Sequence, residues 1–499
     1  MSRFLLARVP ALGCFVSVAS VLVSPEPAFG QPVLYEFNAS SGIGGFVGGL
    51  GDVNADGVPD FALTVSDSQQ YWTEVRSGFD GTLLHSLATF AYTGVGLGDT
   101  DGDGFGDFAL SSSVSYFGKV ELLSGRDASL IHRWDAEKYD DRLGISMSRV
   151  DIDTDGRPEL LVGASYYDAN RGAAFLYSTS DFSLKRQHRG RNSGALLGET
   201  VRAVGDVDAD GSPDYAAHNV ITGDGSGRVE VFSAATGALI FEKRGQPYQF
   251  LGASMADGGD VNGDGYADTW VGLPGTWEPE PSFALLLAGP SGDVLYSIDH
   301  LSGDCFSWSM ANVGDANGDG FPDLLIGAPC FGYADRGRAF LYCGRSFRLL
   351  HVFEGEGQKA RLGWSLDGVG DIDGDGFTDV IIAEPGYSDY SGRIRVHGGD
   401  DLFLQIVQAE AEEGSEVDIA IRGGSPLVCA LLVMVEVDMQ PLFQPLSVQM
   451  LDGNGVWKMA CVVPDGLVGM RFSLQALAQR DAGGGVVCSA PDSFLVVLP

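Results

Sequence analysis

Basic residues are scarce in this chain of 499 residues, which has 31 Lys and Arg against 67 Asp and Glu and a formal net charge of −36. A chain this acidic repels nucleic acids and anionic lipid surfaces, so we expect neither as a partner. Disorder is disfavoured too, because 44% of the residues are hydrophobic and 10% are aromatic. The 71 glycines favour many short strands joined by tight turns and exclude a helical bundle.

Long apolar runs are almost absent. One run, Val9–Val23, follows Arg3 and Arg8 and leads to the small-residue segment Ala28-Phe29-Gly30. This order is typical of a cleaved secretory signal, whereas a spanning helix needs about 20 apolar residues. We therefore predict a signal peptide over residues 1–30 and a secreted product, extracellular or periplasmic, without a membrane span and preferentially monomeric.

Cysteine is sparse as well. Beyond the expected signal six remain, and none lies in a C-x-x-C motif, so zinc-ribbon and thioredoxin-like chemistry find no support. In an oxidising compartment some of the six are expected to form disulfides, but the sequence leaves their connectivity open. The six are Cys305, Cys330, Cys343, Cys429, Cys461 and Cys488.

Catalytic motifs are missing from the sequence. It has no G-x-S-x-G, phosphate loop or H-E-x-x-H. Of the seven histidines, His85, His132 and His351 recur at one point of an internal repeat, which indicates structural strand positions. We predict a protein without a catalytic site; the alternative is a secreted polysaccharide hydrolase or lyase built on the same scaffold.

The repeat itself is an acidic loop. The segment D-V-N-A-D-G-V-P-D from Asp52 returns six times, at intervals of 47 to 56 residues, with oxygen-bearing side chains at positions 1, 3, 5 and 9 and glycine at position 6. Alternate side chains of a tight loop can converge on one point, and position 7 can add its carbonyl. Hard oxygen ligands select Ca²⁺, so we predict up to seven calcium ions; acidic turn chemistry alone is the alternative.

The predicted ligands, by loop, are Asp52, Asn54, Asp56, Val58 and Asp60; Asp99, Asp101, Asp103, Phe105 and Asp107; Asp151, Asp153, Asp155, Arg157 and Glu159; Asp206, Asp208, Asp210, Ser212 and Asp214; Asp260, Asn262, Asp264, Tyr266 and Asp268; Asp315, Asn317, Asp319, Phe321 and Asp323; and Asp371, Asp373, Asp375, Phe377 and Asp379.

These loops differ from EF-hands. An EF-hand has an acidic ligand at position 12 and flanking helices, but position 12 is apolar in all seven copies here. Each loop runs into a β-branched stretch such as Asp379-Val380-Ile381-Ile382, which predicts a buried strand. Four strands per repeat, seven times, predict an all-β fold in which a seven-bladed β-propeller spans residues 31–401.

The sixth copy, Gly314 to Pro329, ends in a literal Gly-Ala-Pro and resembles the FG-GAP repeat family, the blades of the integrin alpha propeller. The resemblance covers about residues 45 to 398. It implies calcium in some blades and a ligand face opposite the calcium loops. The third copy departs from the pattern because it closes with Glu159 rather than aspartate.

The segment Val33–Phe37 precedes the first loop as a fourth strand without a blade of its own. We predict that it completes the seventh blade and closes the ring.

Aromatic residues gather between the expected second and third strands, on the face opposite the metal loops. They are candidate ligand contacts, and packing between neighbouring blades is the alternative. The candidates are Trp72, Tyr116, Tyr167, Trp277, Tyr333 and Tyr387.

The loop pattern stops near Leu402, and strand-like runs separated by glycine pairs occupy the rest of the chain. Residues 402–499 therefore predict a small, immunoglobulin-like β-sandwich that serves as a spacer or attachment module. The whole chain is predicted to be a secreted calcium-binding module for adhesion or for binding an extracellular protein or glycan.

Overall fold

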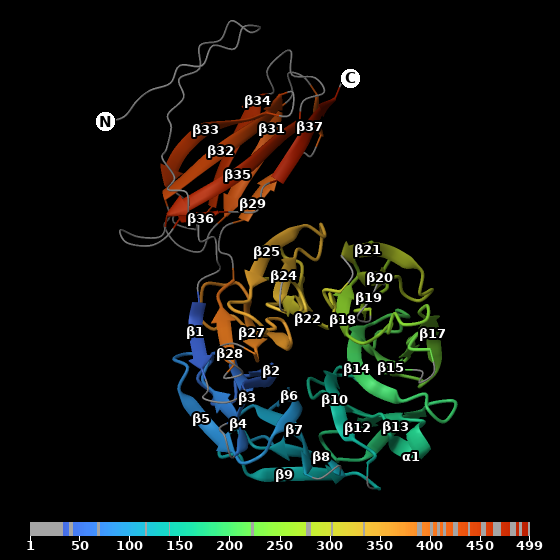
Figure 1. Cartoon of the computed structure of the whole chain (residues 1–499). Helices are drawn as coiled ribbons and strands as arrows, with labels where there is room; N and C mark the ends of the chain where they lie inside the picture. The colour runs from blue at the N-terminus through green and yellow to red at the C-terminus, as the bar shows by residue number, and fades with distance from the viewer. Residues whose placement is uncertain are drawn as a thin grey trace, which may run out of the picture.

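A computed structural model describes residues 33–38, 43–66, 70–114, 117–138, 140–220, 224–275, 281–300, 303–332, 335–386 and 392–399, and nine strands between residues 403 and 497. Seven four-stranded antiparallel sheets are arranged as blades around a common centre (Figure 1). The prediction of an all-β, seven-bladed propeller is confirmed. The predicted signal peptide lies outside the described residues.

The blades share one internal order, and we number them one to seven along the chain. The first strands, nearest the centre, are β2 (Ile43–Gly51), β6 (Ala91–Gly98), β10 (Leu143–Val150), β14 (Leu197–Gly205), β18 (Met255–Gly259), β22 (Ser309–Gly314) and β26 (Leu366–Gly370). The second strands are β3 (Asp60–Ser66), β7 (Asp107–Val114), β11 (Glu159–Ala164), β15 (Asp214–Asn219), β19 (Asp268–Leu273), β23 (Asp323–Ala328) and β27 (Asp379–Glu384).

The outer half of each blade consists of its third and fourth strands. The third strands are β4 (Tyr71–Arg76), β8 (Phe117–Leu123), β12 (Ala173–Tyr177), β16 (Arg228–Phe232), β20 (Ser282–Leu287), β24 (Arg338–Tyr342) and β28 (Arg393–His397). The fourth strands are β5 (Leu83–Leu87), β9 (Leu130–Asp135), β13 (Leu184–Arg189), β17 (Leu239–Arg244), β21 (Val294–His300), β25 (Leu349–Glu354) and, in blade seven, β1 (Val33–Asn38). A single turn, α1 (Tyr167–Asn170), precedes β12.

The N-terminal strand closes the ring. Strand β1 pairs antiparallel with β28, so the seventh sheet has the order β1-β28-β27-β26. This confirms the prediction made from Val33–Phe37. The ring centre of Phe37 lies 5.9 Å from that of Phe61 in blade one, and the Tyr35 hydroxyl donates to the Gly78 carbonyl at 2.9 Å. One segment therefore holds the last blade and the first together.

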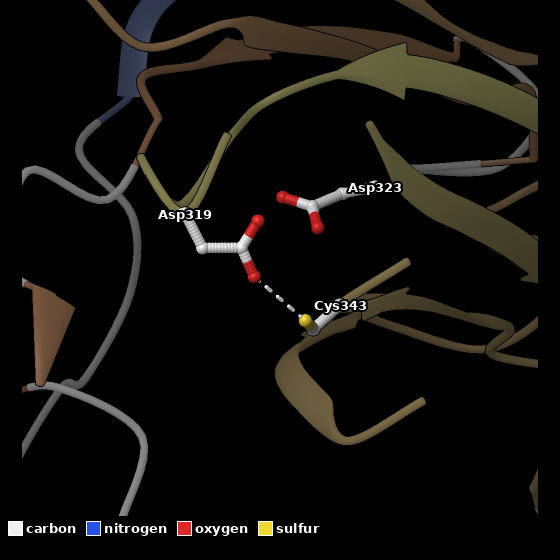
Figure 2. A group of neighbouring side chains, drawn as sticks. All are labelled: Asp319, Asp323 and Cys343. Atoms are coloured by element: carbon white, nitrogen blue, oxygen red, sulfur yellow. Dashed lines mark hydrogen bonds between the residues drawn. The ribbon is translucent and has the colours of Figure 1, made fainter. Parts of the chain in front are cut away.

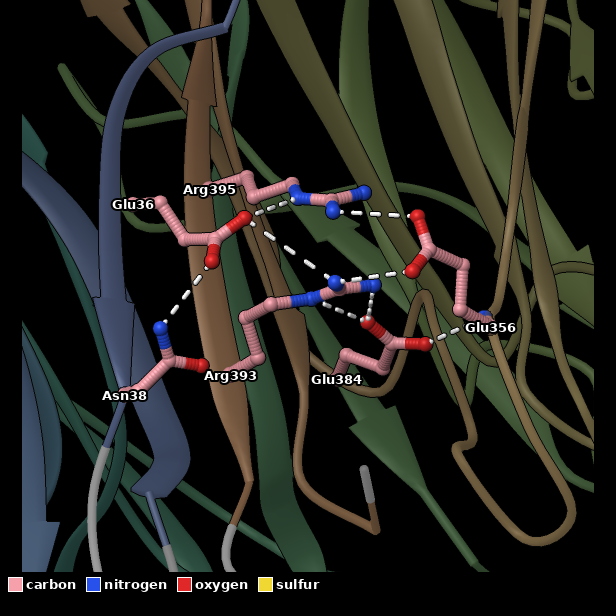
Figure 3. A network of polar contacts seen from close by, with 6 residues as sticks. All are labelled: Glu36, Asn38, Glu356, Glu384, Arg393 and Arg395. Atoms are coloured by element: carbon pink, nitrogen blue, oxygen red, sulfur yellow. Dashed lines mark hydrogen bonds and ion pairs between the residues drawn. The ribbon is translucent and has the colours of Figure 1, made fainter. Parts of the chain in front are cut away.

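Charged side chains reinforce this closure (Figure 3). The Arg393 side chain of β28 is 2% exposed, and its Nε donates to the equally buried Glu384 at 2.8 Å. Its Nη1 lies 3.1 Å from Glu356, which follows blade six. Arg395 bridges Glu356 at 3.0 Å and Glu36 of β1 at 2.8 Å. The network thus ties blade six, blade seven and the N-terminal strand into one cluster.

The hydrophobic core lies between blades rather than within one. Among the described residues there are seven buried clusters, and each combines side chains of two neighbouring blades. One of these seven joins blade seven to blade one. The second strands are buried on both faces, as in β27. Because one four-stranded sheet cannot bury both of its faces alone, closing the ring is what completes the core.

The C-terminal strands form separate sheets. The strands are β29 (Phe403–Ile406), β30 (Glu410–Glu412), β31 (Glu416–Arg422), β32 (Val428–Val437), β33 (Gln440–Met450), β34 (Val456–Val462), β35 (Arg471–Gln479), β36 (Val486–Cys488) and β37 (Asp492–Val497). One sheet has the order β29-β31-β34; the other has the order β30-β37-β35-β32-β33, with β36 paired to β35. Their packing as an immunoglobulin-like sandwich stays a prediction, as does the boundary at residue 402. Within the described residues no helix combines the length and apolarity needed to cross a bilayer.

Candidate metal loops and central cavity

Each acidic loop connects the first strand of a blade to its second. In blade one, β2 ends at Gly51 and β3 begins at Asp60, which is both the last predicted ligand and the first strand residue. All seven loops have strands on both sides, so the distinction from EF-hands is confirmed.

The loop backbone turns its N–H groups onto the carboxylates. Asp52 accepts hydrogen bonds from the N–H groups of Asp56 at 3.1 Å and Gly57 at 2.9 Å, and the same two contacts recur in every loop. The position-6 glycines have φ between +84° and +93°, a left-handed conformation that disfavours a side chain. The first ligand is therefore oriented by local geometry alone.

The position-9 carboxylate connects the loop to the body of the blade. Asp60 is fully buried and accepts N–H bonds from Val53 at 2.8 Å and from Gly78, at the turn between the third and fourth strands, at 2.9 Å. An equivalent bond, from the residue two positions after the third strand, is present in blades two, four, five, six and seven. Glu159 of loop three accepts from Ile152 at 3.2 Å.

Burial raises the pKa of these position-9 acids, and nearby loop carboxylates add to the effect. The pKa is raised to about 6 for Asp60, to about 7 for Asp379 and to about 8 for Asp323. Ionised acids held this closely repel one another, and a bound cation removes that repulsion.

Five loops bring three ligand atoms within 4.8 Å of one another. The groups are Asp99, Asp101 and Asp107; Asp151, Asp153 and Glu159; Asp206, Asp208 and Asp210; Asp371, Asp373 and Asp379; and Asp319, Asp323 and Cys343. Loops one, five and six have an amide at position 3, where Asn54, Asn262 and Asn317 accept the position-5 N–H at 2.8 to 2.9 Å. Clustered carboxylate, amide and carbonyl oxygens are the donor set that calcium requires.

Loop six brings in a residue that the sequence did not assign to a site. The Cys343 thiol lies 3.0 Å from Oδ2 of Asp319, and Figure 2 shows it beside Asp319 and Asp323. It comes from the end of the third strand of the same blade. In the sequence, the indication of this contact was that Cys343 directly precedes Gly344, whose N–H binds the position-9 carboxylate.

Two predicted aromatic ligand contacts lie elsewhere than expected. Trp72 belongs to strand β4 rather than to a loop, is partly buried against the core between blades seven and one, and donates to Glu74 at 2.9 Å. Tyr167 is 8% exposed and belongs to the core between blades two and three. Both rings therefore pack between neighbouring blades, which was the alternative to ligand contact. Tyr116, Trp277, Tyr333 and Tyr387 lie outside the described residues.

A central cavity of about 710 Å³ is lined by residues from all seven blades. It lies at the beginnings of the first strands, so it opens away from the metal loops, which come after the ends of those strands. Trp308 and Trp364 stand side by side on its wall, with ring centres 5.0 Å apart, and Trp308 is 42% exposed.

Polar groups in this cavity lack partners. His218 is 2% exposed, and neither ring nitrogen has a hydrogen-bond partner among the described residues. Oε2 of Glu199, also on the wall, is buried and likewise unpartnered. Burial lowers the pKa of His218 to about 3, which keeps it neutral. Unpaired buried polar atoms are costly, so they mark a place where water or a ligand supplies hydrogen bonds.

The remaining candidates have structural roles. His85, His132 and His351 lie in the fourth strands β5, β9 and β25, which confirms the predicted strand positions. Cys305, in the connection between β21 and β22, forms a disulfide with Cys330, which follows β23. Cys343 pairs with no other described cysteine.

Residues 306–342 and 362–397 match the model of the FG-GAP repeat. This chain contains FG-GAP repeats. The two matched FG-GAP segments hold the first three strands of blades six and seven, together with loops six and seven.

The chain is also distantly homologous to integrin alpha chains over about half of its length. It is 28% identical to integrin alpha-PS2 of Drosophila melanogaster over 44% of this chain and 17% of that one. Identity is 28% with integrin alpha-V of Gallus gallus, over 46% and 24%, and 30% with integrin alpha-4 of Xenopus laevis, over 50% and 25%. The matches thus span a quarter or less of these relatives. A solved structure described as "Structure of Dos1 propeller" covers 79% of this chain and 93% of its own, with 11% identity and a TM-score of 0.41.

Proposed function

We propose that this protein is an extracellular, calcium-binding propeller that binds a protein or glycan ligand and catalyses no reaction. The homology to integrin alpha chains and the Cys305–Cys330 disulfide support an extracellular location. The C-terminal sheets, packed as a sandwich, serve as a spacer or attachment module. The protein works as a monomer.

Calcium has a structural role in this proposal. The first and last ligands of each loop accept hydrogen bonds from the backbone, and in six of the seven loops the position-9 acid also accepts one from the outer half of its blade. An ion held between them ties the loop to its blade. Because the loops recur in all seven blades, the ions stabilise the whole ring rather than one site.

The central cavity is the observation that carries the ligand-binding proposal. Paired tryptophans give an apolar platform, and His218 and Glu199 offer hydrogen-bonding atoms that no group in the described part of the chain uses. An apolar wall with a few convergent polar groups is typical of binding sites. Rings that stack on a ligand face and acids that orient its hydroxyl or amide groups suit a sugar or a polar peptide segment.

A glycan array probed with the full chain, in calcium and in EDTA, tests the glycan branch. Trp364→Ala is expected to weaken any captured glycan at least tenfold, because it removes half of the platform. Phe79→Ala is the matched control, since Phe79 is 70% exposed in a turn on the metal-loop side of blade one. Equal loss in both variants, or none in Trp364→Ala, contradicts the proposal.

The protein branch and the enzymatic alternative are separated in the same preparation. A panel of immobilised extracellular matrix proteins replaces the glycans, with the same two variants. A reducing-sugar release assay on the polysaccharides that the array identifies is expected to stay at background. Sugar release that Trp364→Ala abolishes would instead establish a hydrolase, and release of unsaturated products a lyase.

A further inference from the structure

Arg202, in strand β14 of blade four, is a positively charged side chain on the wall of the central cavity. Burial raises the pKa of Asp367, another residue of that wall, and the charges of Arg202 and Arg149 oppose the rise. Asp367 belongs to blade seven and lies three residues after Trp364. The charge of Arg202 therefore acts on the part of the cavity that carries the tryptophan pair.

The guanidinium of Arg202 has unused hydrogen-bonding capacity. In the described part of the chain it forms no ion pair and no hydrogen bond. The Asp367 carboxylate is occupied elsewhere, because it accepts the N–H groups of Gly49 at 3.2 Å and of Gly368 at 3.0 Å. A guanidinium matches a carboxylate with paired, charge-assisted hydrogen bonds. Arg202 can therefore receive an anionic group from a ligand.

The other unpartnered groups of the cavity suit hydroxyl groups. Oε2 of Glu199 is buried and accepts hydrogen bonds. The neutral ring of His218, which is 2% exposed, has one nitrogen that donates and one that accepts. A sugar hydroxyl both donates and accepts, so it can pair with either residue. Polar atoms buried this deeply make hydrogen bonds in most proteins, which points to a ligand or to water at this wall.

A carboxylated sugar uses all of these groups, whereas other ligand classes leave some of them unpaired. A cationic side chain of a protein ligand offers donors only and meets the like charge of Arg202. A neutral sugar leaves the guanidinium without a partner. A carboxylated sugar brings an anion, hydroxyl groups and a ring face together, and the indoles of Trp308 and Trp364, 5.0 Å apart, can pack against that ring.

We propose that the central cavity binds the acidic end residue of a glycan, such as a hexuronate, with its carboxylate held by Arg202. The hydroxyl groups of that residue pair with Glu199 and His218, and its ring packs against Trp364. This inference rests on the glycan branch of the proposed function and names its ligand class. The acidic metal loops do not prevent binding, because they lie beyond the opposite ends of the first strands, and bound calcium offsets part of their charge.

The test compares acidic glycans with the same glycans after their carboxyl groups have been reduced to hydroxymethyl groups. The probes are short oligosaccharides of galacturonate, glucuronate and mannuronate, and an acetylated peptide with a free carboxyl terminus represents the protein alternative. Binding to the full chain in saturating calcium is measured by titration calorimetry. We expect the parent to bind at least one acidic form about tenfold or more tightly than its reduced form, because charge-assisted hydrogen bonds are lost on reduction.

Arg202→Met should bind the acidic and reduced forms about equally, because the group that distinguishes them is gone. Arg202→Lys should keep part of the preference, since it retains the charge but not the planar fork. Arg126→Met is the matched control, because it removes the same charge from an exposed turn of blade two on the metal-loop side. It should keep the full preference of the parent.

Equal binding of the acidic and reduced forms by the parent overturns the carboxylate assignment but leaves glycan binding intact, and it does so even if Arg202→Met fails to fold. An unchanged preference in a folded Arg202→Met has the same consequence. Binding of the peptide but of no acidic glycan overturns the assignment in favour of a protein ligand. If no glycan in either form binds, or if Trp364→Ala leaves glycan binding unchanged, the glycan branch of the proposed function fails as well.

Discussion

A buried ion pair lies in the blade that closes the ring, and removing one partner tests how much it stabilises the fold. Arg393 and Glu384 are each 2% exposed and lie in neighbouring strands of blade seven. Burial raises the pKa of Glu384, and Arg393 opposes that rise. In Arg393→Met the carboxylate stays buried without its counter-charge, so we expect the free energy of unfolding to fall by about 3–5 kcal/mol.

Two further variants separate this cost from that of lost packing. In the double variant Arg393→Met, Glu384→Gln no charge is left behind, and the amide oxygen can still accept the Glu356 N–H. We expect it to recover at least half of the lost stability, because replacing both partners of a buried pair is often close to neutral. Arg395→Met removes a more exposed arginine, 19% exposed, and should cost about 1 kcal/mol or less.

The assay is urea unfolding in saturating calcium, followed by tryptophan fluorescence and checked for two-state behaviour by circular dichroism. The reasoning is refuted if Arg393→Met loses no more stability than Arg395→Met. It is refuted as well if the double variant is as unstable as Arg393→Met.

Three other outcomes are expected. EDTA should lower the melting temperature by many degrees, because each site adds about 2.7 kcal/mol at a hundredfold excess of calcium over its Kd; an unchanged melt would exclude structural calcium. Gly104→Ala should lower the free energy of unfolding by about 1–2 kcal/mol, because the φ of Gly104 is +90°. An added Cβ meets no atom within 4 Å, so backbone strain is the expected cause. An unchanged free energy of unfolding would contradict this interpretation of the loops. Because burial lowers the pKa of His218 to about 3 from 6.5, its contribution to stability is complete above pH 6.5 and declines on acidification. Between pH 7.5 and pH 4.5 the free energy of unfolding of the parent should therefore fall by about 2–3 kcal/mol more than that of His218→Leu. Denaturant titrations at the two pH values measure this difference. Equal losses in the two proteins would show that His218 does not titrate as expected.

The loop repeat and its direct consequences could be predicted without any coordinates. Ligand spacing within nine residues is a local property, so the amino-acid order alone gives the positions of the oxygens and of the position-6 glycines. The number of blades equals the number of loops. The closing role of Val33–Phe37 was predictable as well. A fourth strand without a blade of its own can complete only the blade that lacks a fourth strand, which is the last one in the chain.

Contacts across strands and between blades emerged only from the folded chain. Cys343 is 24 residues from Asp319 and lies outside the nine-residue loop pattern, so the sequence did not predict the contact between them. Tyr167 and Trp72 looked like exposed loop rings, but neighbouring blades cover them. Arg393 finds Glu356 and Glu36 only once the ring is closed. These contacts depend on how strands lie within a blade or on how blades pack face to face, and the residue spacing of a single loop determines neither.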